Sequence, residues 1–174
     1  MDVRPALTLA LALALALALA HAPAGAAQAA QAARAARARL SETEVRAFVG
    51  RQSRAWNAGD LAGYFALFTP DAVFTDQALA RDGRVVPYGS SSVTQARSQV
   101  RRALAASKVH EVTTVSAVIL ARDGRSARVT AAEDTTISGG GRPRRVCAQR
   151  VMVVVGTPGG LRSKGQTDTV VRCR

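Results

Sequence analysis

The chain has 174 residues and carries 24 Lys and Arg against 12 Asp and Glu, a formal net charge of +12. This length suits one domain, and an apolar share of 48% is typical of a globular chain rather than a disordered one. Two cysteines exclude a disulfide-dense miniprotein and a four-cysteine zinc site. The basic residues are scattered without interleaved aromatic residues, so nucleic acid is not an expected partner.

The first 26 residues have the layout of a secretory signal peptide. A short, weakly positive start leads into Ala6–Ala20, a Leu/Ala run interrupted only by Thr8, and small residues then fit cleavage after Ala24 or Ala26. The alternative is an uncleaved anchor, but the run is short for a bilayer core of about 30 Å. We expect export, to the periplasm rather than the medium, with no stable membrane insertion after cleavage.

The domain is predicted over residues 41–174, after an Ala/Arg-rich linker at 27–40. Ser41 and Glu44 have the S-x-x-E spacing of a capping box, which predicts a helix start. The residues that then recur at helical spacing, as a stripe facing a core, are Val45, Phe48, Val49, Gln52 and Trp56.

A second helix is predicted from Leu61 to Phe68, capped by Asp60 and ended by Thr69-Pro70, because the residue before proline disfavours the α region. A short strand, Val73–Thr75, an irregular segment over 77–92 and a third helix over 93–106 complete this half of the domain.

The rest of the chain is predicted to form strands joined by turns. The strongest turn signal is Asp123-Gly124. The four predicted strands are Glu111–Ala121, Arg128–Ser138, Val146–Val155 and Arg162–Cys173. Helices followed by an antiparallel meander predict an α+β domain, with the helices packed on one face of the sheet.

The two cysteines fall on the last two predicted strands. Folding these strands about Gly159-Gly160 places opposite each other residues whose numbers sum to about 320, as do Cys147 and Cys173. Directly opposed residues lie within bridging range, and an exported protein is in a compartment where a disulfide persists. The bond would add about 3 kcal/mol. Two free thiols or intermolecular pairing are the alternatives.

Strand alternation suggests which face of the sheet is concave. On the last two strands the odd positions collect Gln149, Val151, Val153, Val155 and Val171, whereas the even ones collect Arg150, Lys164, Asp168 and Arg172. The odd face is therefore predicted to be buried. On the preceding strand Glu133 shares its parity with Val129 and Ile137, which would point it inward; the alternative places it near a sheet edge, in water or paired with an Arg.

The stretches Arg54–Leu61, ending W-N-A-G-D-L, and Ala66–Phe74, A-L-F-T-P-D-A-V-F, resemble the nuclear transport factor 2-like superfamily, and most of all its SnoaL-like and ketosteroid-isomerase-like branches. The resemblance covers about residues 41–174. It implies a cone in which three N-terminal helices pack on a curved antiparallel sheet. Such a cavity hosts enzymes, ligand binders and dimerisation modules, so it leaves activity open.

The resemblance also implies candidate site residues. Asp76 occupies the position of the acidic base of isomerases and cyclases, on the same strand face as Phe74, where burial would raise its pKa. Gln52 and Gln149 stand where isomerases place oxyanion donors, and a glutamine amide is a weaker donor. The expected ligand-lining residues are Trp56, Tyr64, Phe74, Tyr88, Glu133 and Val151.

Two functions remain. The favoured one is an exported, non-catalytic domain that binds a small apolar or amphipathic ligand or a protein partner, with homodimerisation through the outer sheet face as one arrangement. The alternative is a cofactor-independent isomerase or cyclase with Asp76 as general base, which requires Asp76 and Gln149 to converge on one small molecule. No cofactor or metal is expected in either case.

Overall fold

The protein is described by a computed structural model over residues 39–139 and 141–174. The predicted signal peptide and nearly all of the predicted linker lie outside the described residues. Leu40, at the end of that linker, is buried in the core, and its backbone N–H donates to the carbonyl of Gly124 at 2.7 Å. The folded part therefore includes Leu40, just ahead of the predicted start.

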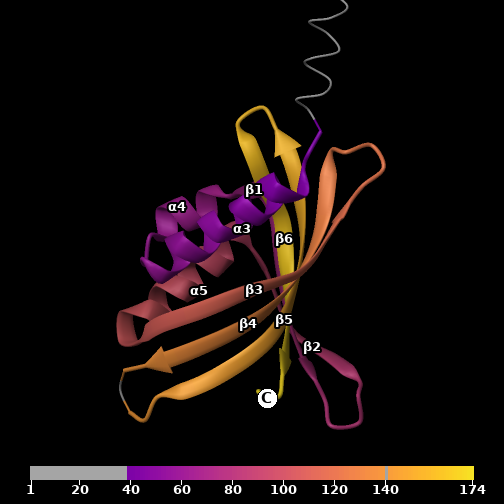
Figure 1. Ribbon diagram of the computed structural model, residues 1–174. Helices are drawn as coiled ribbons and strands as arrows, with labels where there is room; N and C mark the ends of the chain where they lie inside the picture. Colours follow the sequence, from indigo (N-terminus) through magenta and orange to yellow (C-terminus); the bar gives the residue numbers. More distant parts are fainter. Residues whose placement is uncertain (1–38, 140) are drawn as a thin grey trace, which may run out of the picture. The chain divides into compact units, whose positions relative to one another are not determined.

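Three helices lie on one side of the sheet (Figure 1): α3 (Glu42–Asn57), α4 (Leu61–Ala66) and α5 (Val93–Ala106). The predicted capping box at Ser41 is present, and a second one begins α5, the helix predicted over 93–106. The second helix ends at Ala66, earlier than predicted, because Phe68 already pairs with Ser163 in the sheet. No helix among the described residues is long and apolar enough to cross a membrane.

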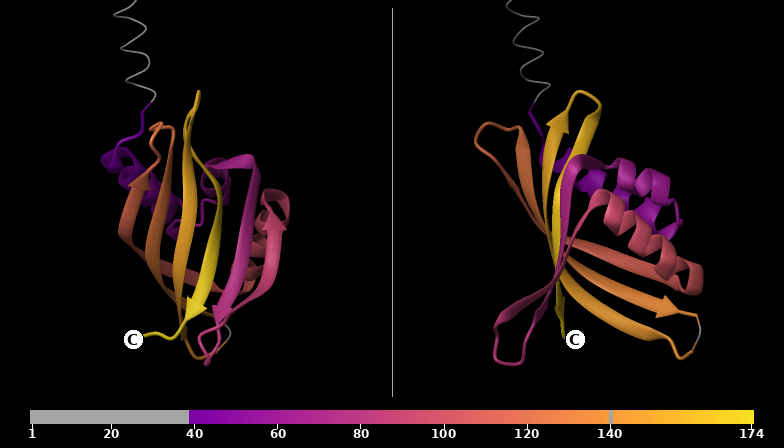
Figure 2. Two further views of the ribbon diagram at one scale, coloured as in Figure 1. Left: turned by 90° about the vertical axis from the view of Figure 1, so that its right-hand side faces the viewer. Right: turned by 180° about the vertical axis from the view of Figure 1, so that it is seen from behind.

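Six strands form one strongly curved sheet in the order β2-β1-β6-β5-β4-β3 (Figures 1 and 2). Their bounds are β1 (Phe68–Leu79), β2 (Val85–Ser92), β3 (Lys108–Leu120), β4 (Ser126–Ser138), β5 (Arg144–Thr157) and β6 (Gly160–Val171). The predicted four-strand meander is confirmed as β3 to β6. The sheet is mixed rather than purely antiparallel, since β1 runs parallel to β6.

The β1–β2 hairpin corrects the predicted short strand at 73–75 and irregular segment at 77–92. Pro87 and Gly89 argued against a strand, but β2 is an edge strand with a register shift opposite Asp76 and Gln77, where proline is tolerated. On the other side of β1, Gly165 has a φ of +128°, and a side chain there would overlap the backbone of Val73. The close approach of β1 to β6 thus requires this glycine.

The core has two parts under the helices. One packs α3 against β4 and β5, with Phe48, Val129 and Val154 at its centre. The other is rich in aromatic residues and joins α4, β1 and α5. Its buried aromatic residues are Tyr64, Phe65, Phe68 and Phe74. Their ring centroids lie 4.7–6.3 Å apart, which is within the usual range for aromatic contacts. This second part adjoins the candidate site.

The prediction of which face of β5 and β6 is buried is wrong. Met152 and Val154, at even positions, are in the core, and Arg150 shares their face, whereas Val153 is exposed. A buried polar group occupies the concave face, while valines cover the convex one. Because the side-chain period of a strand is two, the error places Arg150 and Asp168 on the wrong face. The first part of β6, before the register shift, follows the prediction, since the odd positions Leu161 and Ser163 face the core.

Cys147 and Cys173 form a disulfide with a Cα–Cα distance of 5.2 Å. Their predicted direct opposition is off by two residues, since Cys147 pairs with Val171 and Cys173 follows the end of β6. The turn lies at Pro158-Gly159, and a register shift follows between Met152 and Val154. A two-residue offset keeps both cysteines on the same sheet face, so the bridge can still close.

Candidate functional site

A cavity of about 230 Å³ lies between the helices and the concave face of the sheet. Its apolar walls come from α3, α4, β1 and α5, and its polar floor comes from β3, β5 and β6. The lining residues include Trp56, Tyr64, Phe65, Phe74, Ala96 and Val100 on the walls, and Asp76, Glu111, Arg150, Gln166 and Asp168 among the polar groups.

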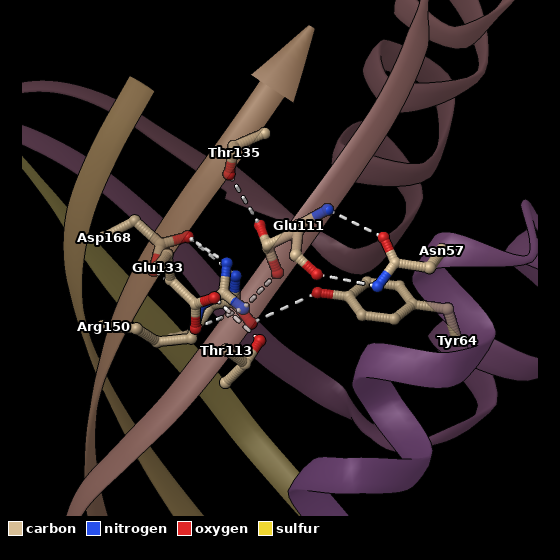
Figure 3. A network of polar contacts seen from close by, with 9 residues as sticks. Asn57, Tyr64, Glu111, Thr113, Glu133, Thr135, Arg150 and Asp168 are labelled. Carbon is tan, nitrogen blue, oxygen red and sulfur yellow. Dashed lines mark hydrogen bonds and ion pairs between the residues drawn. The ribbon is translucent and has the colours of Figure 1, made fainter. Parts of the chain in front are cut away.

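Arg150 of β5 is the centre of the polar floor (Figure 3). Its Nε and Nη2 donate to the two carboxylate oxygens of Asp168 at 2.7 and 3.0 Å. Its Nη1 lies 3.1 Å from Glu111 Oε1 and 3.0 Å from Glu133 Oε1. One guanidinium, with its side chain only 11% exposed, thus bridges carboxylates from three other strands.

Neutral side chains hold these carboxylates in place. Thr113 Oγ1 donates to Glu133 Oε2 at 2.8 Å, and Gln166 Nε2 donates to Asp168 Oδ2 at 2.8 Å. The hydroxyl of Tyr64 donates to Gln166 Oε1 at 3.3 Å. Asn57, at the end of α3, bonds both backbone groups of Glu111 at 2.8 Å, which ties the helix to β3. The network is therefore fixed from helices and sheet together (Figure 3).

Burial sets the protonation of this cluster. It raises the pKa of Glu133 to about 8; Arg150 opposes the shift and the Glu111 carboxylate adds to it. Burial, with a further contribution from Asp168, also raises the pKa of Asp76. Burial raises the pKa of Tyr64 far above its usual value, so its hydroxyl remains a donor. For Arg150 burial opposes the charge, but Asp168 and Glu111 keep its pKa above the usual value.

The raised pKa of Glu133 predicts a pH-dependent stability. Between its usual value of 4.5 and about 8, the folded protein holds a proton that the unfolded chain has released. The free energy of unfolding should therefore fall as pH rises through this window, by up to about 1.4 kcal/mol per pH unit for one proton. Glu133→Gln should remove this slope, and urea unfolding between pH 5 and about 8.5 measures it.

Glu42→Gln is the matched control, because Glu42 pairs with Arg46 on the exposed surface of α3. That variant should retain the wild-type dependence of unfolding free energy on pH. A Glu133→Gln protein with the same slope as wild type would show that Glu133 is already ionised when folded.

Four of the residues predicted for the site line the cavity together: Asp76, Trp56, Tyr64 and Phe74. Asp76 faces inward like Phe74, as predicted, and packs over Gly89 of β2, where an added Cβ would lie 3.1 Å from Asp76 Oδ2. Glu133 also faces inward, as its parity with Val129 indicated, and is 3% exposed. It belongs to the network rather than to the cavity wall, and it pairs with an arginine.

The other predicted residues lie elsewhere. Gln149 and Val151 are on the outer face of β5, since their neighbours Arg150 and Met152 face inward. Tyr88 is 63% exposed on the β1–β2 hairpin and does not line the cavity. Gln52 is buried on α3, next to Tyr64 and Arg150 but outside the cavity, and neither polar atom of its side chain has a hydrogen-bond partner among the described residues.

Sequence reasoning missed Arg150, Glu111, Gln166 and Asp168. The available signal was polar residues at every second position: Glu111 and Thr113 on β3, Glu133 and Thr135 on β4, and Gln166 and Asp168 on β6. Such alternation on adjacent strands indicates one polar strip across a sheet face. Among the described residues, no group of three or more His, Cys, Asp or Glu side chains could hold a metal ion.

Comparison with known proteins finds no matching family model and no matching curated protein. Solved structures do match. A conserved protein from Planctomyces limnophilus has a TM-score of 0.61 at 16% identity, over 75% of this chain and 95% of its own. A ketosteroid isomerase-like protein from Erwinia carotovora has a TM-score of 0.58 at 12% identity, over 77% of this chain and 100% of its own.

A third match is an NTF-2-like protein of unknown function from Shewanella oneidensis, with a TM-score of 0.53 at 10% identity, over 75% of this chain and 99% of its own. At these identities the comparisons establish the fold rather than the activity. The chain has the nuclear transport factor 2-like fold.

Proposed function

We propose that the protein is an exported, non-catalytic domain that binds a small apolar or amphipathic molecule in the cavity between its helices and its sheet. The observation that carries this proposal is the cavity itself, about 230 Å³, which has aromatic side chains on its walls and a cluster of polar and charged groups on its floor. Preformed cavities that combine apolar walls with convergent polar groups are typical of small-molecule sites. The Cys147–Cys173 disulfide is compatible with export.

The arrangement of hydrogen-bond donors favours binding over catalysis. The two glutamines expected as oxyanion donors do not reach the cavity that holds Asp76: Gln149 faces outward and Gln52 lies outside the lining. The guanidinium of Arg150 is engaged by three carboxylates, and the hydroxyl of Tyr64 donates to Gln166. An enolate formed beside Asp76 would therefore not be met by the two expected glutamines, by Arg150 or by Tyr64; Trp56 Nε1 is the buried donor in the lining that has no partner among the described residues.

Trp56 provides a direct test, because it is the only tryptophan in the chain and it lines the cavity. Cyclohexanone, a small neutral ketone, should produce a saturable change in the emission of Trp56. Val100→Phe, which adds a ring to the cavity wall, should weaken this binding at least about tenfold, since overpacking an occupied site costs roughly 1–3 kcal/mol. Val112→Phe, on the exposed outer face of β3, is the matched control.

The same ketone separates the two candidate functions. A binder should leave the α-hydrogens of cyclohexanone exchanging in D2O no faster than in buffer alone, as proton NMR would show. Exchange that requires Asp76 would instead establish it as a general base and replace the binding proposal with the enzymatic one. Equal binding by wild type and Val100→Phe would place the ligand outside this cavity.

A further inference from the structure

The charge of the cavity is unbalanced toward the negative. Among the residues that line it, Asp76, Glu111 and Asp168 carry carboxylates, and Arg150 is the one positive side chain. Arg150 also pairs with Glu133, which lies behind the cavity wall. Its Nε and Nη2 bind Asp168, and its Nη1 lies between Glu111 and Glu133. The guanidinium is therefore occupied by the protein and is not available to bind an anionic ligand.

Asp76 is the carboxylate of the cavity lining that does not pair with Arg150. It is half-buried, and within residues 39–139 and 141–174 no hydrogen bond or ion pair engages its side chain. Its neighbour across the β1–β6 pair is Asp168, whose two oxygens are already held by Arg150 and Gln166. Its neighbour on β2 is Gly89, which makes room for the carboxylate and offers no side chain to pair with it.

Aromatic rings form the wall of the same cavity. Trp56 and Tyr64 pack with ring centroids 5.1 Å apart, Tyr64 and Phe65 at 5.2 Å, and Phe65 and Phe74 at 5.9 Å. The faces of aromatic rings attract cations and accept an apolar body, and Trp56 Nε1, which has no partner among the described residues, is a wall donor that could meet an acceptor atom. An unpaired carboxylate among aromatic rings thus suits a molecule that is both apolar and positively charged.

We propose that the ligand of this cavity is a small organic amine, bound as its ammonium cation to Asp76, with its apolar body against the aromatic wall. This inference rests on the proposed function and names the chemical class of the ligand. The cavity has the liquid volume of about eight water molecules, which suits an amine with one ring. Salt screens charges more than about 8–10 Å away; Arg97, whose guanidinium carbon lies 5.7 Å from the centroid of the Phe65 ring, is a nearer cation outside the lining.

A matched set of three probes tests the charge of the ligand at constant size. 2-Phenylethylamine is cationic at pH 7, 2-phenylethanol is neutral, and phenylacetate is anionic. Titrations followed by Trp56 emission and calorimetry should show that the amine binds about tenfold or more tighter than the alcohol, the difference that a charged hydrogen bond makes. Phenylacetate should bind more weakly than the alcohol.

Asp76→Asn should remove the preference for the amine, so that the variant binds 2-phenylethylamine no tighter than it binds 2-phenylethanol. Asp71→Asn is the matched control, because it removes an exposed carboxylate from the same strand; it should keep the full preference. Thermal melts of both variants should show that each is folded.

The possible failures are distinguishable. If wild type binds 2-phenylethanol as tightly as 2-phenylethylamine, the amine inference is wrong and the cavity remains a binding site for neutral molecules. If Asp76→Asn keeps the preference, the cation is bound elsewhere and the inference is also wrong. If none of the three probes binds and the emission of Trp56 does not respond, both this inference and the proposed function are contradicted.

Discussion

Arg150→Met is expected to destabilise the fold by about 3–5 kcal/mol, the usual cost of breaking a buried ion pair from one side. The substitution keeps most of the side-chain volume but leaves the carboxylates of Asp168 and Glu111 without their cation, next to the Glu133 carboxyl, which the raised pKa keeps largely protonated at pH 7. Each of these side chains is at least largely buried, from 2% exposed for Glu133 to 21% for Asp168. Urea unfolding at pH 7, followed by circular dichroism, measures the loss.

Arg145→Met is the control for this prediction. Arg145 lies on the same strand and also makes a bidentate pair, with Asp134, but both side chains are exposed. Exposed pairs contribute little, so this variant should unfold close to the wild-type urea concentration. If Arg150→Met were equally mild, the carboxylates would have to accept protons or water without cost, and the network would not hold the floor of the cavity.

The effect of Arg150→Met should shrink at low pH. The carboxylates that lose their partner can then be neutralised by protonation, which removes the uncompensated charge. The burial that raises the pKa of Glu133 acts in this direction already in the wild type. Stability curves of the two proteins should therefore approach each other below about pH 5, where an explanation based on lost packing alone would predict a constant difference.

Much of the fold followed from local rules in the sequence. The capping box at Ser41, the boundaries of α5 and the meander from β3 to β6 were all predicted, because caps, turns and long alternating strands are encoded by adjacent residues. The β1–β2 hairpin was not predicted. Its pairing depends on an edge position that tolerates Pro87 and on the close approach that Gly165 allows, and both are properties of the assembled sheet.

The site was only partly predictable for a related reason. Asp76 and the aromatic residues were found through a resemblance and a simple parity with Phe74. Arg150 was missed because a strand with valines on one face and an arginine on the other predicts a buried apolar face. Here the arginine is buried because carboxylates from three other strands meet it, and no single strand shows that convergence.

Removing the disulfide should lower the stability by about 3 kcal/mol, with a fall in melting temperature of about 10 °C. The bond joins residues 26 positions apart and ties Cys173, just beyond the end of β6, to β5. Without it, the last residues are held only by contacts such as the hydrogen bond from Arg145 Nη1 to the carbonyl of Arg174. The double variant C147S/C173S tests this by urea and thermal unfolding.

The double variant also contains its own control. Because it has no cysteines, a reductant should not change its unfolding, whereas reduced wild type should unfold like the double variant. The loss should be independent of pH between 5 and about 8.5, unlike the effect of Glu133→Gln, because a cross-link acts mainly on the entropy of the unfolded chain. If reduction leaves wild-type stability unchanged, the four strands from β3 to β6 already fix this end of the sheet without the bond.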